Sequence, residues 1–458
     1  MNLAQTYLGE KFLQTTLNYI LNNPERNLPA LVSLAEKVAR DPNHKRNIES
    51  IKRIMNDENN VWRKYALRLL KQTHPNVKRK VLVNFFLNAS LLGVPKQNEI
   101  AKRLGTAVPF TILVDPTERC NLNCTGCWAG DYQRREELDY ETLDRLFTEA
   151  EELGIYLIVL SGGEPLIRKD DILALADKHR DQVLHIFTNA TLIDDDFVED
   201  LQRVGNITFA ISIEGFESTT DERRGKGVFK KVINAMEMLK EAGIIYGFSA
   251  TYTRKNTEEL GTDEFVDLMI EKGNVLGWFF TYVPVGKDVD LDFMATPEQR
   301  AFMFEKMRHW RQTKPIFMVD FWNDGEASYG CIAGGRRYLH INARGDVEPC
   351  AFVHFATTNI KEVTLKEALC SPLMKAYQKR QPFNTNLLRP CPLIDNPEAL
   401  REIVHESGAY STQLGGADVD EYVDRISRYS RHWGEVADDI WAKYHPCACQ
   451  EQARASAD

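Results

Sequence analysis

From about residue 106 to residue 285 the chain alternates short apolar runs with longer segments of helical periodicity. The run IYLIVL at 155–160 is typical of a buried strand, and it follows a helix-like stretch at 140–153. Strands that alternate with helices in this way form parallel sheets. The pattern predicts an α/β fold, and six such units suggest an open, partial (β/α)6 barrel of the TIM type. The predicted strands begin near Phe110, Tyr156, Val183, Ile207, Ile244 and Val275.

The segments on either side of this region have different patterns. Before it, apolar residues recur only at helical spacing, in Phe12–Ile20, Leu28–Val38, Ile48–Ile54 and Val61–Leu70. After it come a helix at 297–313, a strand or loop at 316–325, and a predicted hairpin of 338–342 with 346–350. The tail predicts helices, with a long one from Asp418 to Tyr444. We expect a helical domain at 1–105, a barrel at 106–325, a small cysteine-containing extension at 326–396 and a helical tail at 397–458.

Charge is unevenly distributed along the chain. The first 110 residues hold 18 lysines and arginines against 8 acidic residues, a net of +10, whereas the whole chain carries −9. The basic residues concentrate at 62–80, directly before the apolar run 81–94. This combination suits an anionic membrane surface or an acidic partner, and we expect no nucleic acid because no recognition motif is present. The alternative is a solvated charged face that caps the mouth of the barrel.

Two further features favour a cytoplasmic location, with an option of peripheral attachment to the inner membrane face. The opening MNLAQTYLGEKF lacks the basic-then-apolar order of a signal peptide. The run 81–94 is shorter than the ~18 apolar residues that span a bilayer. In a reducing compartment, nine cysteines favour metal ligation over disulfides.

The most informative cysteines are Cys120, Cys124 and Cys127, in the loop CNLNCTGCW that follows the first predicted strand. Three thiolates within eight residues can bind one soft metal centre. They are one fewer than the four that usually close an iron–sulfur cube, which leaves one iron open to another ligand. The alternatives on this spacing alone are a structural zinc knuckle or plain buried thiols.

Three later strands also end in polar residues. The second strand runs into SGGEP, where glycines allow a close main-chain approach and one carboxylate offers acceptors for an ammonium group. By itself this string is equally consistent with an ordinary strand-to-helix turn. Active sites of α/β barrels gather at the carboxyl ends of strands, so these ends predict one site. The candidates there are Gly162, Gly163, Glu164, Thr188, Asn189, Ser212 and Glu214.

Together, the three-cysteine loop and the SGGEP turn resemble the radical S-adenosylmethionine (SAM) superfamily. One departure is Gly126, where the family usually has an aromatic residue; Trp128 follows the third cysteine instead. The resemblance implies a [4Fe–4S] cluster on the three cysteines, with SAM on the open iron and cleaved to a 5′-deoxyadenosyl radical. It also implies that Glu164 binds the SAM amino group and Ser212 its ribose or carboxylate. Arg224 is a candidate for the methionine carboxylate, because a guanidinium pairs bidentately with that group.

A second group of cysteines follows the barrel. Cys331, Cys350 and Cys391 resemble the start of the SPASM or twitch region of the same superfamily, but the later run of closely spaced cysteines is absent. We therefore expect one auxiliary [4Fe–4S] cluster, with structural zinc as the alternative. The fourth ligand is open: Cys370 is a weak candidate within a helix-like segment. Cys447 and Cys449 are interpreted as incidental or weakly metal-binding thiols near the terminus.

These features predict a radical SAM enzyme that abstracts a substrate hydrogen and receives electrons from a reductant such as flavodoxin or ferredoxin. The whole layout is loosely similar to synthases that join lipid alkyl tails into membrane-spanning tetraether-type or diabolic-acid-type lipids. The alternative substrate is a peptide or protein, the commonest task of SPASM enzymes. A non-catalytic iron–sulfur or zinc scaffold is the alternative outside enzymes. On the aromatic sixth strand, we expect core packing more than a substrate wall for Trp278, Phe279, Phe280 and Tyr282.

Overall fold

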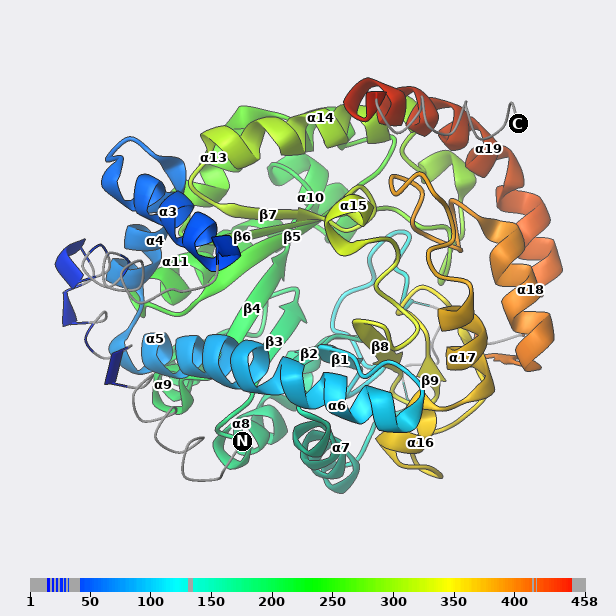
Figure 1. Cartoon of the computed structure of the whole chain (residues 1–458), viewed down its shortest axis with the longest axis horizontal. Helices are drawn as coiled ribbons and strands as arrows, with labels where there is room; N and C mark the ends of the chain where they lie inside the picture. Colours follow the sequence, from blue (N-terminus) through cyan, green and yellow to red (C-terminus); the bar gives the residue numbers. More distant parts are fainter. Residues whose placement is uncertain are drawn as a thin grey trace.

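The fold is an open, mostly parallel sheet with helices around it (Figure 1). The computed structural model describes residues 42–130, 135–413, 416 and 418–446, with short pieces between 15 and 32. Nine strands follow the order β7-β6-β5-β4-β3-β2-β1-β8-β9, and all neighbours are parallel except β8 and β9. The strands are β1 Thr111–Val114, β2 Leu157–Leu160, β3 Val183–Thr188, β4 Ile207–Ser212, β5 Tyr246–Tyr252, β6 Leu276–Thr281, β7 Phe317–Asp320, β8 Tyr338–Ile341 and β9 Val347–Glu348.

Helices connect these strands and cover the sheet. Around the barrel they are α7 Tyr140–Leu153, η2 Pro165–Arg168, α8 Lys169–Lys178, α9 Asp195–Val204, α10 Glu217–Arg224, α11 Val228–Glu241, α12 Thr257–Leu260, α13 Asp263–Glu271, η3 Leu291–Phe293 and α14 Pro297–Thr313. The remainder of the chain adds α15 Gly325–Ser328, α16 Leu365–Leu369, α17 Pro372–Lys379, α18 Pro397–Ser407 and α19 Val419–Tyr444, with β10 Phe355–Ala356 paired to β11 Tyr410–Ser411.

The α/β prediction is confirmed, and the six predicted strands begin within two residues of β1 to β6. The hairpin predicted at 338–350 is β8 with β9, and the long predicted helix is α19. Two joins extend the six-strand core. The segment left open as strand or loop is β7, parallel to β6, and β8 pairs in parallel with β1. The second join is long-range: Thr111 lies opposite Tyr338 on one side and Leu157 on the other.

Local sequence sets the helix ends. Helix α9 begins after Asp194, whose carboxylate accepts the amide N–H of Phe197, and ends at Gly205 with φ of +76°. An acidic N-cap satisfies a free N–H at the helix start, and glycine tolerates the left-handed stop. Between these caps, Phe197, Leu201 and Val204 face inward and are buried with the sheet residues of the main core. The αβ loop that follows delivers the chain to β4.

The N-terminal helices lie against the amino-terminal ends of the strands. They are α3 Pro42–Asn56, α4 Val61–Gln72, α5 Pro75–Leu82, the π-helix η1 Val83–Gly93 and α6 Val94–Leu104. In Figure 1, α5, η1 and α6 form a long blue-to-cyan rod across the lower part of the molecule. Gly93 is in close contact with the end of α7, because a Cβ there would lie 2.5 Å from the carbonyl oxygen of Gly154.

Side chains of these helices donate to carbonyls just before the strands. Asn84 Nδ2 donates to the Gln182 carbonyl at 2.9 Å, and Gln97 Nε2 donates to the Gly154 carbonyl at 2.8 Å. Arg68 donates to three carbonyls, those of Ile270, Asn274 and Pro315, at 2.8 to 3.0 Å. These carbonyls lie at helix ends and αβ turns, where the backbone needs outside donors. Part of the basic charge at 62–80 therefore forms hydrogen bonds within the molecule and does not face solvent.

No helix in the described part of the chain is both long and apolar enough to cross a bilayer. This agrees with the expectation for the apolar run 81–94, which forms η1 and is interrupted by the buried Asn84. The predicted helices at 12–20 and 28–38 lie almost entirely outside the described residues.

We predict that Arg68→Gln destabilises the fold, because three carbonyls at the base of β6 and β7 lose a charged donor. The expected loss of unfolding free energy is about 2 kcal/mol, in the range for a hydrogen bond to a charged group. Urea unfolding measures it. Arg79→Gln is the matched control, because Arg79 is exposed and its side chain donates to the neighbouring Asn76 instead of to the barrel. Equal midpoints for both variants would contradict the structural role of Arg68.

Candidate active site

The three-cysteine loop follows β1 at the carboxyl ends of the strands. Cys120, Cys124 and Cys127 are partly exposed, and they lie close enough to affect one another electrostatically. Burial raises the pKa of Cys120 to about 11, and the charges of Glu164, Cys124 and Cys127 add to the rise. Burial also raises the pKa of Cys127. Thiols gathered in this way repel one another as thiolates, and bound iron relieves that repulsion, so the residues fit a cluster.

The glycine turn after β2 docks on the segment that leads into this loop. The amide N–H of Gly163 donates to the Thr117 carbonyl at 2.9 Å, and that of Glu164 donates to the Arg119 carbonyl at 2.8 Å. A Cβ on Gly163 would lie 2.1 Å from the Arg119 carbonyl oxygen. The sequence suggested that the glycines admit a cofactor. In the structure, Gly163 admits the backbone just before Cys120 and so fixes where the loop starts.

Glu164 holds the ends of β2 and β3 together. Its buried carboxylate accepts the Thr188 hydroxyl at 2.6 Å and the amide N–H groups of Asn189 and Leu166 at 2.8 and 3.0 Å. Burial raises the pKa of Glu164, and these hydrogen bonds oppose the rise. The Asn189 side-chain amide then donates to Asn121 Oδ1 in the cysteine loop at 2.9 Å. The structure thus brings Glu164, Thr188 and Asn189 to one place beside the thiols.

Glu214, after β4, lies between two arginines. Its buried carboxylate is 2.6 Å from Arg223 Nη1 and 2.5 Å from Arg224 Nη2. The Arg224 guanidinium therefore already has a carboxylate partner. Ser212 ends β4 half-buried, beside Ser249 of β5.

Arg223 is a site residue that the sequence analysis missed. Its backbone carbonyl accepts the Thr125 N–H at 3.0 Å, and its Nε donates to the Thr125 carbonyl at 3.2 Å. Arg223 thus clamps the cysteine loop to α10, between Cys124 and Cys127. The signal was present in the sequence as the adjacent pair in DERRGKG, but the side of α10 that meets the loop depends on the fold.

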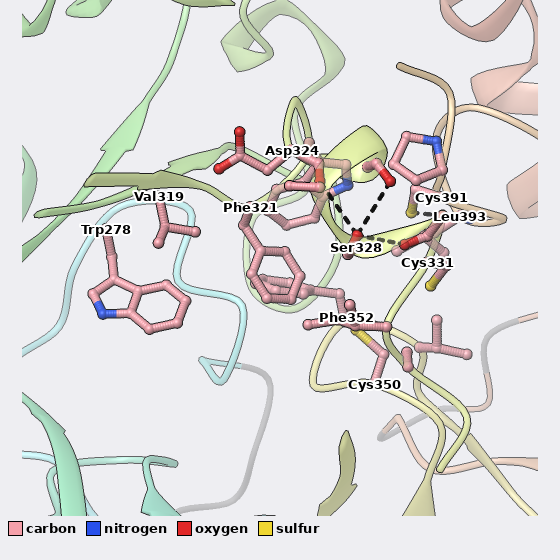
Figure 2. A pocket seen from close by; sticks show the side chains of 18 of the residues that line it. Trp278, Val319, Phe321, Asp324, Ser328, Cys331, Cys350, Phe352, Cys391 and Leu393 are labelled. Atoms are coloured by element: carbon pink, nitrogen blue, oxygen red, sulfur yellow. Dashed lines mark hydrogen bonds between the residues drawn. The ribbon is translucent and has the colours of Figure 1, made fainter. Parts of the chain in front are cut away.

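The second group of cysteines lines one cavity of about 510 Å³ (Figure 2). Cys331, Cys350 and Cys391 come from three separate segments, yet the charges of all three raise the pKa of Tyr377, after burial as the main cause. The Tyr338 hydroxyl donates to Cys350 Sγ at 2.6 Å. Burial raises the pKa of Cys350 to about 12. As at the loop, thiols crowded together in a buried place fit an iron centre.

The remaining cysteines are not part of this group. Cys370 directly follows α16 and is absent from the residues that line the cavity. Cys447 and Cys449 lie outside the described residues. Within the described ranges, no three Cys, His, Asp or Glu side chains converge as they would around a single metal ion.

Aromatic side chains connect the two groups of cysteines. Trp128, next to Cys127, lies 5.7 Å from Phe352, which lies 5.1 Å from Trp322, as ring centroids. Phe352, Trp322 and Trp278 line the cavity. The core interpretation of the sixth strand holds for Phe279, which stacks on Trp310, and is wrong for Trp278. Successive strand residues face opposite sides, but the sequence did not show which side holds a cavity.

A buried set of two carboxylates and one imidazole joins the end of β1 to strands β8 and β9 of the hairpin. His340 Nε2 is 2.9 Å from Asp115 Oδ2, and His340 Nδ1 is 2.6 Å from Glu348 Oε2. All three side chains are fully buried. Burial lowers the pKa of His340, but the two carboxylates outweigh it and raise this pKa to about 10. The raised pKa favours the charged imidazolium, and the His340 ring stands edge-on to Trp128, with 5.8 Å between centroids.

Comparison with known proteins identifies both halves of this arrangement. A model of the radical SAM superfamily matches residues 114–266, and one of the SPASM iron–sulfur cluster-binding domain matches residues 331–392. The chain carries a radical SAM domain followed by a SPASM domain. It is a radical SAM enzyme. Its cofactors are a [4Fe–4S] cluster, SAM and auxiliary iron–sulfur clusters bound by the SPASM domain.

Similar proteins carry out different tasks. An AdoMet-dependent heme synthase of Methanosarcina barkeri is 27% identical over 57% of this chain and 82% of its own length. A PqqA peptide cyclase of Granulibacter bethesdensis is 26% identical over 53% of this chain and 67% of its own. Among solved structures, Streptococcus suis SuiB bound to S-adenosylmethionine has 22% identity and a TM-score of 0.55, covering 66% of this chain and 76% of that one. This likeness shows a shared fold.

We predict that the anaerobically reconstituted radical SAM enzyme holds about eight iron and eight sulfide per chain, from two cubane clusters. Replacing Cys120, Cys124 and Cys127 together by Ala should remove about half of the iron, since the second group is built from other segments. Iron and sulfide analysis measures this. Cys370→Ala is the control and should keep full iron. Unchanged iron in the triple variant, or zinc alone in the wild type, would contradict the presence of two clusters.

We predict that Glu164→Ala weakens SAM binding by roughly 10- to 100-fold, the range for losing a charge-assisted hydrogen bond. The cluster absorption spectrum should stay intact, because the substitution keeps the main-chain N–H of residue 164, which donates to the Arg119 carbonyl at the start of the loop. Equilibrium dialysis with radiolabelled SAM measures the affinity. Glu164→Gln keeps the size and one acceptor oxygen, so a smaller loss is expected. Normal SAM affinity in Glu164→Ala would remove Glu164 from the site.

We predict a pH-dependent role in stability for His340. Its pKa in the folded protein, about 10, lies above the ordinary value of 6.5. The imidazolium therefore contributes stability in full below about pH 6.5, and the contribution is lost as pH rises through about 10. The stability difference between wild type and His340→Gln should shrink over that window, as measured by urea unfolding. A difference that grows with pH would contradict the assigned charge state.

Proposed function

We propose that this enzyme abstracts a hydrogen atom from an apolar part of its substrate, which is held in the cavity beside the auxiliary cysteines. The observation that carries the proposal is the cavity itself, which combines three thiols with an aromatic wall. The loop cysteines Cys120, Cys124 and Cys127 would hold the cluster that binds SAM. Cys331, Cys350 and Cys391 would hold the auxiliary cluster.

When bound, the two clusters and SAM supply a 5′-deoxyadenosyl radical and an acceptor for one electron. The protein's part is to place and shield the reacting groups. Glu164 and Asn189 fix the strand ends beside the cysteine loop. Arg223 anchors the loop, and Glu214 pairs with both arginines and offsets one of their two positive charges. Gly162, Gly163, Thr188, Ser212 and Arg224 stay predictions as SAM contacts, together with Glu164, Asn189 and Glu214. Flavodoxin or ferredoxin would supply the electrons.

The chemistry of the cavity favours hydrocarbon over polar groups. Its walls include Trp278, Phe321, Trp322, Phe352, Ile332 and Leu393. Apart from the indole N–H of Trp278, which has no hydrogen-bond partner among the described residues, the charged and hydroxyl side chains of the wall are already paired. Arg311 lies 2.5 Å from Asp324, and the Ser328 hydroxyl donates to the Gly330 carbonyl at 2.7 Å. A polar substrate group placed away from the Trp278 N–H would lose its water without gaining a free partner, which costs free energy.

The first candidate substrate is a lipid alkyl chain, which would be coupled to another carbon chain. The aromatic cavity supports it, and so does η1, where Phe86 and Leu91 are 56% and 53% exposed. The membrane-facing role of residues 62–80 needs one revision. Arg68 is bonded to the barrel base, so a lipid surface would have to meet the exposed Lys64, Lys71 and Arg79.

The second candidate substrate is a peptide that presents an apolar side chain. It is favoured by relatives that act on peptides. Besides the PqqA peptide cyclase, the mycofactocin maturase MftC of Mycolicibacterium smegmatis is 28% identical over 57% of this chain and 69% of its own length. The cavity accommodates an aromatic or aliphatic side chain as readily as the end of an alkyl tail.

The test measures 5′-deoxyadenosine formation with dithionite as reductant, with and without candidate substrates. Perdeuterated phospholipid vesicles should transfer deuterium to 5′-deoxyadenosine, detectable by mass spectrometry, if a lipid chain is the hydrogen donor. Trp278→Ala should lower this transfer while leaving uncoupled SAM cleavage unchanged. Phe302→Ala, at an exposed position, is the control. Deuterium transfer from a deuterated peptide, and none from lipid, would reject the lipid and support the peptide.

We also predict that vesicle binding, if a lipid is the substrate, rises with anionic lipid content and falls with salt. Each basic residue near such a surface contributes about 1 kcal/mol within a Debye length. Charge reversal at Lys64, Lys71 and Arg79 should abolish sedimentation with vesicles. The control reverses Lys366, Lys375 and Lys379, which are also exposed but lie in the SPASM region. A wild-type protein that ignores anionic vesicles at low salt would contradict membrane docking.

A further inference from the structure

The two groups of cysteines differ in their hydrogen-bond donors. Cys120 accepts the backbone N–H of Leu122 at 3.5 Å, and Cys127 that of Ala129. No side-chain hydroxyl of the described residues donates to Cys120, Cys124 or Cys127. The SPASM thiols accept backbone N–H groups too, as in Leu393 to Cys391 at 3.3 Å, and they also meet two tyrosine hydroxyls.

We propose that the hydroxyls of Tyr338 and Tyr377 donate hydrogen bonds to the thiolate ligands of the auxiliary cluster and raise its reduction potential. The proposal rests on the proposed function, in which Cys331, Cys350 and Cys391 are those ligands. It names two positioning residues for the auxiliary centre.

Tyr338 is placed for this contact by the hairpin. It is the first residue of β8, and Cys350 follows β9, so the hairpin returns the thiol to the tyrosine. The oxygen-to-sulfur distance is 2.6 Å, and the tyrosine is only 5% exposed. The ring lies against Phe321 at 6.1 Å between centroids. The tyrosine is thus largely shielded from solvent, which strengthens the hydrogen bond through the low local dielectric.

Tyr377 comes from a different element, helix α17. Its hydroxyl lies 3.4 Å from Cys331 Sγ, within the limit for a hydrogen bond to sulfur. The ring stands edge-on to Phe383 at 5.1 Å. It also packs on Gly334, where a Cβ would lie 2.3 Å from Tyr377 Cδ1. These contacts hold the ring independently of the hydroxyl, so removing the oxygen should leave the ring in place.

Two donors at the sulfur ligands favour the reduced cluster, which carries one more negative charge. Hydrogen bonds to the sulfurs are one of the main determinants of cluster potential, and outer-shell donors tune metal centres generally. At the loop, Arg223 and Arg224 bring two positive charges near the thiols, and Glu214 offsets one of them. At the second group, Arg336 brings positive charge near Cys331, while Asp395, close to Cys391, is itself paired with Arg300. The difference that these charges do not account for is the pair of hydroxyls. A higher reduction potential favours an auxiliary cluster that accepts an electron from the substrate bound in the cavity.

The experiment is an EPR-monitored redox titration of the anaerobically reconstituted, full-length holoenzyme, with and without SAM. SAM shifts only the spectrum of the loop cluster, so the auxiliary signal is the one that SAM leaves unchanged. The variants are Tyr338→Phe, Tyr377→Phe and the double substitution. Tyr246→Phe is the matched control, because Tyr246 is a buried tyrosine whose hydroxyl donates to the Met236 carbonyl, far from either cysteine group.

The auxiliary midpoint potential should fall in Tyr338→Phe, fall less in Tyr377→Phe, whose contact is longer, and fall most in the double variant. The loop cluster and Tyr246→Phe should keep the wild-type potentials. An unchanged auxiliary potential with full iron content overturns the inference alone. Loss of auxiliary iron in Tyr338→Phe also overturns it, because the hydroxyl would then be an iron ligand. A wild-type enzyme with no cluster at Cys331, Cys350 and Cys391 overturns the proposed auxiliary site and the inference together.

Discussion

The parallel pairing of β8 with β1 is the constraint on which the rest of the molecule depends. β1 has β2 on one side and β8 on the other, so residues near 111 and 338 lie side by side although about 227 residues separate them. The cysteine loop starts where β1 ends, and the hairpin from β8 returns the chain to Cys350. One short strand therefore places the radical SAM loop next to the SPASM region. The Asp115–His340–Glu348 set stabilises the join, because its members come from the three segments that meet there.

The parts of the molecule that depend on local pattern could be predicted from the sequence. Apolar runs located β1 to β6, and cysteine spacing together with the SGGEP turn identified the chemistry. The hairpin was predicted from its turn, but its partner β1 was not, because sheet pairing across hundreds of residues leaves no mark on local periodicity. The same reason explains why Arg223 was missed and Trp278 misassigned to the core. Each depends on which way a side chain faces after the elements have packed.

The charge asymmetry shows how a composition argument can mislead. A basic segment next to an apolar run suggested an outward-facing surface. In the structure, Arg68 is turned toward the barrel and bonded to three carbonyls, and Asn76, Asn84 and Gln97 do similar work with neutral side chains. Positive charge near helix carboxyl ends also complements their dipoles. Part of the positive charge of residues 62–80 therefore forms hydrogen bonds within the molecule, and only the exposed basic residues are available to a partner.

The contacts of Arg68 also affect how the chain can fold while it is being synthesised. Its three acceptor carbonyls lie 202, 206 and 247 residues further along the sequence. During synthesis, helix α4 therefore leaves the ribosome long before the groups that it binds exist. Domains generally fold as units as they emerge, but this one cannot complete its base until β7 has appeared. Until then, the amphipathic helices would expose apolar faces, which is the stage at which a nascent chain of this kind most needs chaperones.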